Sequence, residues 1–306
     1  MRFDLADKKV TLLLNRRSGR REGETVESQI RDAVAPVVGE FDVRRLGKGD
    51  NITNIARHAV DTGSDVILAL GGDGTQAAVA DALVGTDAVM AVLPGGTFNY
   101  FAREYGIGEN WQAGLQTFLT GAVRKVSVGR VNDRVFLNNA SFGAYPEILE
   151  RREDHYKRWG RSRLGAYWAV ISALGDLRKP MHLAVTVDGK TQTYETALVF
   201  VAKNAFQLES LGLDGADAVR DGHFALFIAH AHEPWGLVGA AIRLALGRVS
   251  KGSDFDMVVS DKISVETRPA RRLVAYDGEK EKMVGPFTLE VLPDALSVIV
   301  PGEGGR

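Results

Sequence analysis

The chain has 306 residues, which exceeds the usual size of one hydrophobic core and favours two domains. Its 38 lysine and arginine residues nearly balance 39 aspartate and glutamate residues, and the formal net charge of -1 argues against a broadly basic nucleic-acid-binding protein. There is no cysteine, which excludes disulfides, thiolate metal ligands and cysteine nucleophiles and suits a cytoplasmic protein.

The first residues lack the apolar run of a signal peptide. No segment approaches the roughly 18 consecutive apolar residues that are needed to cross a bilayer. The longest candidate, Trp235 to Leu246, is interrupted by Arg243. We therefore expect a cytoplasmic protein, with peripheral contact at the inner membrane surface as a further option.

Residues 1–125 are predicted to form an α/β domain with a parallel sheet. Short apolar runs at 10–14, 66–70 and 88–93 alternate with segments whose apolar residues fall on one helical face. Two such helical segments cover residues 26–37 and 52–60. This alternation is typical of strand–helix–strand units.

Residues 126–306 are predicted to form a β-rich, sandwich-like domain. Strand-like alternation from Leu183 to Val187 is followed by Asp188-Gly189, a typical two-residue hairpin signal. Further strand-like runs cover 197–201, 224–229, 263–267 and 296–300. Two helical stretches are also predicted, at 163–177 and 235–246.

A glycine-rich loop follows the predicted strand 65–70 and precedes a helical segment at 76–83. It consists of Gly71, Gly72, Asp73, Gly74 and Thr75. At the carboxyl end of a parallel strand, glycines let backbone N–H groups approach phosphates, and the next helix N-terminus favours negative charge. Asp73 would reach a phosphate-bound Mg²⁺. The alternative is a plain glycine-rich turn.

A second loop, Leu93 to Arg103, also follows a predicted strand. Gly95, Gly96, Thr97 and Asn99 offer backbone and side-chain donors to phosphates or ribose. The alternative is a loop whose phenylalanines merely pack. Neither the Walker pattern nor the dinucleotide pattern G-x-G-x-x-G occurs, which excludes the ordinary phosphate-binding loops.

Three further segments carry polar side chains next to predicted strands. The first strand ends in a turn with Asn15, Ser18, Gly19 and Arg20. Asp277, Gly278 and Glu279 follow a strand-like run at 273–276, and Asp221 precedes Gly222. Asn15 and Ser18 are also ordinary turn formers, and Asp-Gly is a common hairpin turn, so structural roles stay open.

Taken together, these segments resemble the diacylglycerol kinase and sphingosine kinase family of lipid kinases. The Gly71 to Thr75 loop is similar to a nucleotide loop that this family shares with NAD kinases and, in variant form, phosphofructokinases. The segment Pro94 to Arg103 resembles the P-x-G-T-x-N-x-F-A-R segment of the lipid kinases, whereas NAD kinases carry another sequence there. The resemblance runs from about residue 10 to residue 300.

The resemblance implies ATP and Mg²⁺ as cofactors and assigns roles to individual residues. Asp277, in a D-G-E segment with Glu279, would be the general base that accepts the proton of the lipid hydroxyl. Asp73 and Asp221 would contact divalent ions, Asp221 at a structural site that some members have. The turn after the first strand and both glycine loops would bind the nucleotide.

Several positions depart from the family pattern. Tyr100 and Ser127 stand where many members have aspartate, the pair Ala77-Ala78 stands where many have Asn-Glu, and Arg16 replaces a usual proline. The chain is therefore either a branch with another lipid acceptor or a protein with a weakened site.

The sequence predicts a lipid kinase with diacylglycerol as the default acceptor and a sphingoid base, ceramide or another lipid alcohol as options. One alternative is a kinase for a soluble metabolite of the NAD kinase type, and another is a nucleotide-binding regulator. The basic, aromatic-bearing segment 151–163 would lie in a membrane interface or form a solvated helix. The pair His230 and His232 would bind a metal or stay at the surface as ordinary histidines.

Overall fold

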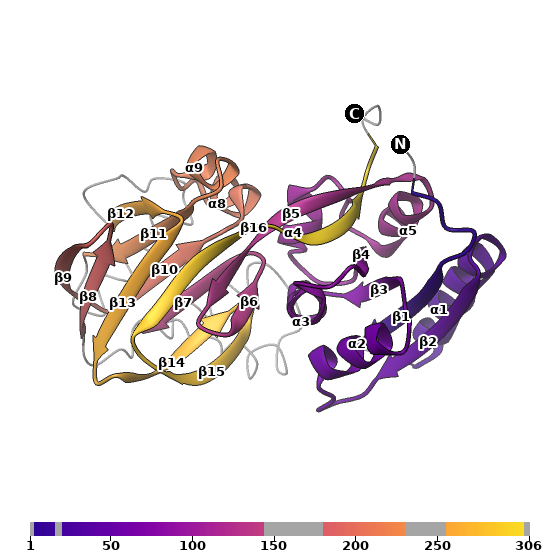
Figure 1. Cartoon of the computed structure of the whole chain (residues 1–306), viewed down its shortest axis with the longest axis horizontal. Coiled ribbons are helices and arrows are strands. Elements are labelled where there is room, and N and C mark those ends of the chain that lie inside the picture. The colour runs from indigo at the N-terminus through magenta and orange to yellow at the C-terminus, as the bar shows by residue number, and fades with distance from the viewer. Residues whose placement is uncertain (1–2, 16–19, 144–179, 231–254, 303–306) are drawn as a thin grey trace. The chain divides into compact units, whose positions relative to one another are not determined.

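The computed structural model describes residues 3–15, 20–143, 180–230 and 255–302, without the side chains of residues 20–23. The chain divides into two compact units, Met1–Val128 with Pro293–Arg306 and Gly129–Leu292. In Figure 1 the strands and helices follow one another from indigo at the N-terminus to yellow at the C-terminus. The predicted combination of an α/β domain and a β-rich domain is confirmed.

The first unit contains a parallel sheet in the order β2-β1-β3-β4. Its strands are β1 (Lys9–Asn15), β2 (Glu40–Leu46), β3 (Val66–Gly71) and β4 (Val89–Pro94). Its helical segments are α1 (Arg20–Val34), η1 (Ala35–Val37), α2 (Ile52–Asp61), α3 (Asp73–Leu83), α4 (Tyr100–Glu104) and α5 (Trp111–Thr120). The strands β3 and β4 are buried along their whole length, as expected of parallel strands that are covered on both faces.

Apolar side chains from the strands and helices form the core of this unit. Leu12 and Leu68 from the sheet join Ile30 of α1 and Phe118 of α5 in one buried cluster. Helices α2 and α5 begin at asparagine caps, because the side chains of Asn51 and Asn110 each accept a backbone N–H bond at 2.9 Å. The apolar runs and helical faces of the sequence therefore fold as their periods predict.

Strands β5 (Ala122–Val131) and β16 (Phe287–Val300) each run from one unit into the other. The end of β16 pairs in parallel with β4, with Ser297 opposite Val89. Residues 293–302 thus lie with the first unit, whereas the predicted domain boundaries placed them in the second. A strand-like run such as 296–300 specifies a strand but not the sheet that it joins.

The second unit is built from antiparallel strands in two sheets. One contains β13-β8-β9 together with the start of β16, and the other has the order β12-β11-β10-β7-β14-β15. The strands are β6 (Arg134–Phe136), β7 (Asn139–Gly143), β8 (Met181–Val187), β9 (Lys190–Thr196), β10 (Leu198–Ala202), β11 (Phe224–Ala229), β12 (Phe255–Ser260), β13 (Lys262–Arg268), β14 (Arg271–Tyr276) and β15 (Glu279–Val284).

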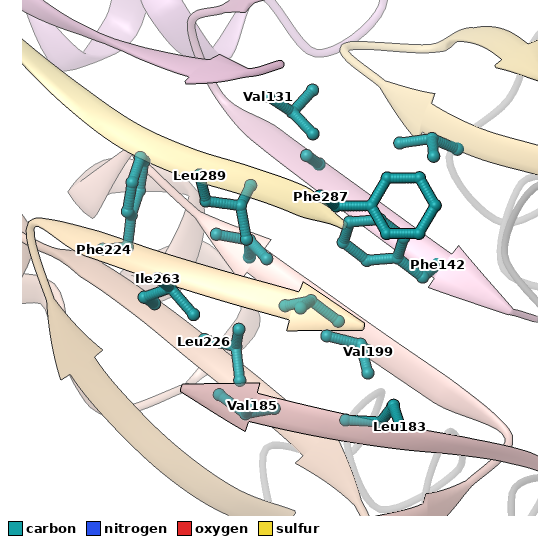
Figure 2. Close-up of a cluster of buried hydrophobic side chains, with 14 of the residues drawn as sticks. Val131, Phe142, Leu183, Val185, Val199, Phe224, Leu226, Ile263, Phe287 and Leu289 are labelled. Atoms are coloured by element: carbon teal, nitrogen blue, oxygen red, sulfur yellow. The ribbon is translucent and has the colours of Figure 1, made fainter. Parts of the chain in front are cut away.

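Alternate side chains of both sheets meet in one apolar core. Figure 2 shows Phe142 of β7 and Val199 of β10 in the same cluster as Leu183 of β8 and Phe287 of β16. The rings of Phe142 and Phe287 lie 5.0 Å apart, centroid to centroid. Such interdigitation between two sheets is the arrangement of a β-sandwich, as the sequence predicts.

Asp188 and Gly189 form the predicted two-residue hairpin between β8 and β9, and both have positive φ angles. The helices α8 (Ala205–Leu211) and α9 (Ala216–Arg220) are additions that the sequence analysis does not predict. The predicted helices 163–177 and 235–246 lie outside the described residues. None of the described helices is long and apolar enough to cross a membrane.

Candidate functional site

The two glycine loops pack directly against each other at the carboxyl ends of β3 and β4. The N–H of Gly95 donates to the carbonyl oxygen of Gly71 at 2.9 Å. A Cβ on Gly96 would lie 2.6 Å from the Cα of Gly72, and a Cβ on Gly72 would lie 3.1 Å from the Cα of Gly96. Gly72 and Gly96 are therefore required by the close approach of two backbones, in addition to any role toward a phosphate.

The end of β1 is joined to the first loop by a side-chain hydrogen bond. Asn15 is the last residue of β1, and its Nδ2 donates to Oγ1 of Thr75 at 2.8 Å. The Thr75 side chain in turn occupies the space that a Cβ on Gly71 would need. The structure thus brings together Asn15 and the loop from Gly71 to Thr75, as the sequence predicts for the strand ends of a parallel sheet.

Asp73 links the first loop to the second. Its carboxylate accepts the backbone N–H of Asn99 at 2.9 Å and those of Tyr100 and Phe101, which begin helix α4. Burial raises the pKa of Asp73 above its ordinary value, and these backbone hydrogen bonds oppose that shift. The side chain therefore holds the two loops together besides standing at the start of α3.

Asn99 closes the second loop from inside. It is almost fully buried and has a positive φ angle of 51°, a conformation that asparagine tolerates well. Its Oδ1 accepts the N–H of Gly96, and its Nδ2 donates to the carbonyl oxygens of Gly96 and Glu109. Both amide hydrogens are thus used within the protein, and Asn99 acts here as a loop-shaping residue. Thr97 is partly exposed in the same loop.

The N-terminus of α3 carries donors that suit an anion. Helix α3 spans 11 residues, and its N-cap Gly72 has no side chain that could satisfy the first N–H groups. Such a terminus favours negative charge. One further polar group lies behind it, because the side chain of Gln76 is fully buried, with Nε2 bound to the Gly71 oxygen and with Oε1 lacking a partner.

The structure describes only some of the nucleotide-binding residues that are predicted in the turn after β1. Arg20 begins helix α1, whereas Ser18 and Gly19 lie outside the described residues. At the divergent positions, Tyr100 stacks on Phe98 with ring centroids 5.3 Å apart.

Asp277 lies in the turn between β14 and β15, in the second unit. It has a φ angle of 46° and Gly278 has one of 92°, so the residue is a hairpin turn former as well as a candidate base. It is only 6% exposed. Its carboxylate accepts three consecutive backbone N–H groups, those of Leu137, Asn138 at 2.9 Å and Asn139 at 3.1 Å.

A network of buried polar side chains adjoins the segment that binds the Asp277 carboxylate. Asn138, Asn139, Asn204 and Gln207 are all at least nine-tenths buried and are linked by hydrogen bonds. Asn139 Oδ1 is buried without a partner. The sequence analysis does not single out this network.

The candidate metal residues do not form a protein-only site. Asp221 is exposed at the end of α9, and within the described ranges no group of three or more histidine, cysteine, aspartate or glutamate side chains could hold a metal ion. Glu279 is exposed at the first position of β15. Nε2 of His230 lies 2.9 Å from Oδ1 of Asp256, whereas His232 lies outside the described residues.

Comparison with known proteins assigns a domain family to each half of the chain. The family described as diacylglycerol kinase catalytic domain matches residues 9–131, and the family described as YegS C-terminal NAD kinase beta sandwich-like domain matches residues 147–300.

Two relatives illustrate the similarity in sequence. An uncharacterized protein of Synechocystis sp. is 29% identical over 251 residues, which cover 79% of this chain but only 56% of that protein. A Staphylococcus aureus protein named "putative lipid kinase" is 25% identical over 248 residues, which cover 78% of each chain.

A crystal structure of a "putative diacylglycerol kinase" from Bacillus anthracis shares the fold, with a TM-score of 0.73 over 96% of this chain and 97% of that one, at 21% identity. The first family match contains both glycine loops, and the second contains Asp277. The chain belongs to the diacylglycerol kinase family, with a catalytic domain joined to a YegS-type C-terminal β-sandwich-like domain.

Proposed function

We propose that the protein is an ATP-dependent lipid kinase that transfers the γ-phosphoryl group to a lipid hydroxyl, with diacylglycerol as the default acceptor. A sphingoid base, ceramide or another lipid alcohol would undergo the same chemistry. Membership of the family supports kinase activity, and the identity of the acceptor is our own proposal.

The single observation that carries the proposal is the environment of Asp277. A buried carboxylate that three backbone amides hold in one orientation is preorganised for proton transfer. A hairpin turn needs neither burial nor such a set of donors. Asparagine or glycine would suffice for the turn alone.

The proposed reaction is an in-line displacement. The lipid hydroxyl oxygen forms a bond to the γ-phosphorus, the bond from that phosphorus to the β,γ-bridging oxygen breaks, and ADP leaves. The hydroxyl proton passes to the Asp277 carboxylate. The N-terminus of α3 and the backbone of both glycine loops would bind the phosphates.

Asp73 is the residue proposed to hold Mg²⁺, which would neutralise charge on the transferring phosphoryl group when bound. Asp73 lies at the start of α3 and is partly exposed as a residue. Mg²⁺ usually combines one or two carboxylates with substrate phosphates and water, so a single aspartate fits this role. The role of Asp221 at a structural ion stays a prediction.

A turnover assay with labelled ATP and a panel of lipid alcohols tests the proposal. Labelled phosphate should appear in a lipid product that carries a phosphomonoester. A soluble kinase of the NAD kinase type would instead label NAD, which the same assay includes as an acceptor. A protein that binds Mg-ATP but labels no acceptor would be the nucleotide-binding regulator, for which Tyr100, Ser127 and the pair Ala77-Ala78 are the specific motivation.

The same function makes peripheral contact with a membrane part of the proposal, since the acceptor is membrane-borne. The basic segment 151–163 is the candidate contact from sequence and lies outside the described residues. Activity on anionic vesicles should exceed activity on neutral vesicles at low salt. Equal activity on both would remove this contact and leave the kinase proposal in place.

A further inference from the structure

The orientation of the Asp277 carboxylate depends on one short backbone segment. This segment, residues 137–139, consists of the two residues between β6 and β7 and the first residue of β7, and its three N–H groups all donate to that carboxylate. A general base must lie within hydrogen-bond reach of its substrate, and a misplacement of about 1 Å can cost about 10²-fold in rate. Whatever fixes residues 137–139 therefore positions the proposed base.

The pairing of β7 with β10 and β14 holds one end of this segment, and the beginning of helix α8 holds the rest. Nδ2 of Asn204 donates to Oδ1 of Asn138 at 2.9 Å, and the N–H of Lys203 donates to the Asn138 carbonyl oxygen at 2.8 Å. Nδ2 of Asn139 donates to Oε1 of Gln207 at 3.1 Å. Asn138 and Asn204 are each 1% exposed, so water is not at hand to replace a lost hydrogen bond.

A second hydrogen bond sets the orientation of the Asn204 amide. Its Oδ1 accepts the N–H of Gln207 at 2.7 Å and so caps helix α8. Because the oxygen is held by the cap, the amide nitrogen faces Asn138. An ionised aspartate would keep the cap but has no donor, and serine would cap with a shorter side chain.

We propose that Asn204 is a positioning residue for phosphoryl transfer, which acts on Asp277 through Asn138. The proposal rests on the proposed function, because it requires Asp277 to be the general base. Asn204 does not need to touch ATP or the lipid. Its effect should therefore appear in the chemical step and not in nucleotide binding.

The first test compares two variants that preserve the helix cap with a control on the same helix. Asn204→Asp and Asn204→Ser should each lower kcat by about 10- to 100-fold and leave the KM for Mg-ATP within about twofold of the parent. Ser210→Ala is the control, since its hydroxyl bonds only to the Gln207 carbonyl oxygen among the hydrogen bonds described. Its kcat should equal that of the parent.

The second test separates positioning from a general loss of structure. In an Asp277→Asn background, Asn204→Asp should cause no further loss of kcat, because the group on which it acts has been removed. Parental kcat in both Asn204 variants would overturn the inference, and so would a second loss of the same size in the Asp277→Asn background. Parental turnover by Asp277→Asn alone would instead overturn the proposed function and the inference with it.

Discussion

The carboxylate of Asp277 accepts three backbone N–H groups, and this determines what its replacement by asparagine should do. Asparagine tolerates the positive φ angle, so the turn should persist. Its amide NH₂ would face a backbone N–H, which costs about 1 to 3 kcal/mol. If Asp277 is the base, kcat should fall by about 10² to 10⁴, equivalent to about 2.7 to 5.4 kcal/mol of barrier.

Two measurements on Asp277→Asn distinguish a catalytic residue from a turn residue. Mg-ATP affinity, measured by calorimetry, should stay near that of the parent, and kcat should be compared well below the melting temperature of the variant. A residue needed only for the hairpin would give a folded Asp277→Asn protein with parental kcat. That result would remove Asp277 from the mechanism.

Adjacent glycines of the second loop offer a matched pair. A Cβ on Gly96 would meet the Gly72 backbone at 2.6 Å, whereas a Cβ on Gly95 would have its nearest neighbour at an ordinary 3.5 Å. Gly96→Ala should therefore lose about 1 to 3 kcal/mol of stability through overpacking, and Gly95→Ala should unfold like the parent. Thermal unfolding checks both, and a parental melting temperature for Gly96→Ala would contradict the packing role.

The affinity of the Gly95→Ala and Gly96→Ala variants for Mg-ATP tests whether the glycines also let the backbone approach a phosphate. If the backbone of this loop approaches a phosphate, the exposed Gly95→Ala variant should bind Mg-ATP more weakly although its stability is unchanged. Unchanged affinity in Gly95→Ala would confine the glycines to loop packing. The two readings of the glycines thus make different predictions at neighbouring positions.

Residue types and spacing were sufficient to predict where polar groups gather, but not what those groups bind. The strand-end position of Asn15 and Asp73 follows from the alternation of strands and helices. That Asp73 would bond to the start of α4, or that both donors of Asn99 would be used inside the loop, depends on a left-handed backbone at residue 99 and on loop contacts. No local pattern encodes such partners.

At the scale of the element, the β14–β15 hairpin is held by charge as well as by strand pairing. Arg134 donates to both oxygens of Glu281, from Nε at 2.7 Å and from Nη2 at 3.2 Å, and the Tyr276 hydroxyl donates to Oε2 of Glu281 at 3.2 Å. Burial and the nearby negative charges raise the pKa of Tyr276. The hydrogen bond from Arg134 lowers the pKa of Glu281 below its ordinary 4.5.

These contacts predict a pH dependence of hairpin stability. A lowered folded-state pKa means that the contribution of Glu281 is complete above about pH 4.5 and is lost as pH falls through the lower folded-state value. The melting temperature of the parent should therefore fall more steeply on acidification below about pH 4.5 than that of Glu281→Gln. The effect should be small, because both partners are about two-fifths exposed.

Glu279→Gln is the control for this experiment. It removes an exposed carboxylate from the same strand. Its melting temperature should therefore fall on acidification as steeply as that of the parent. If the melting temperatures of the parent and Glu281→Gln fell equally on acidification, the ion pair between Arg134 and Glu281 would not stabilise the hairpin.

Element identity was predictable where period and turn chemistry agree, as in the hairpin at Asp188-Gly189 and the fully buried strands β3 and β4. Helix α8 has seven residues, and its helical face is set by packing of Leu208 on the sheet rather than by a repeated pattern. A segment so short offers fewer than two helical repeats to a periodicity analysis. Tertiary packing therefore decides it.

At the scale of the whole molecule, one strand supplies core residues to both units. Leu289 of β16 is fully buried in the sandwich core, and Ile299, near the end of the same strand, is buried in the core of the α/β unit. Alternation of apolar and polar residues along 287–300 predicts a strand, but it does not indicate where the strand leaves one core and enters the other. The partners of β16 are β13, β4 and β5, and of these β4 and β5 are distant from it in sequence.

This division predicts that Leu289→Ala and Ile299→Ala destabilise different units, each by about 2 to 5 kcal/mol. Mg-ATP stabilises only the folded form that binds it, so the thermal transition that rises with added Mg-ATP belongs to the nucleotide-binding unit. Ile299→Ala should lower that transition and Leu289→Ala should lower the other, as measured by calorimetry with and without Mg-ATP. The two substitutions are matched in size and lie on one strand. If Leu289→Ala lowered the Mg-ATP-sensitive transition as much as Ile299→Ala, the two units would unfold as one cooperative body, and β16 would couple them rather than merely join them.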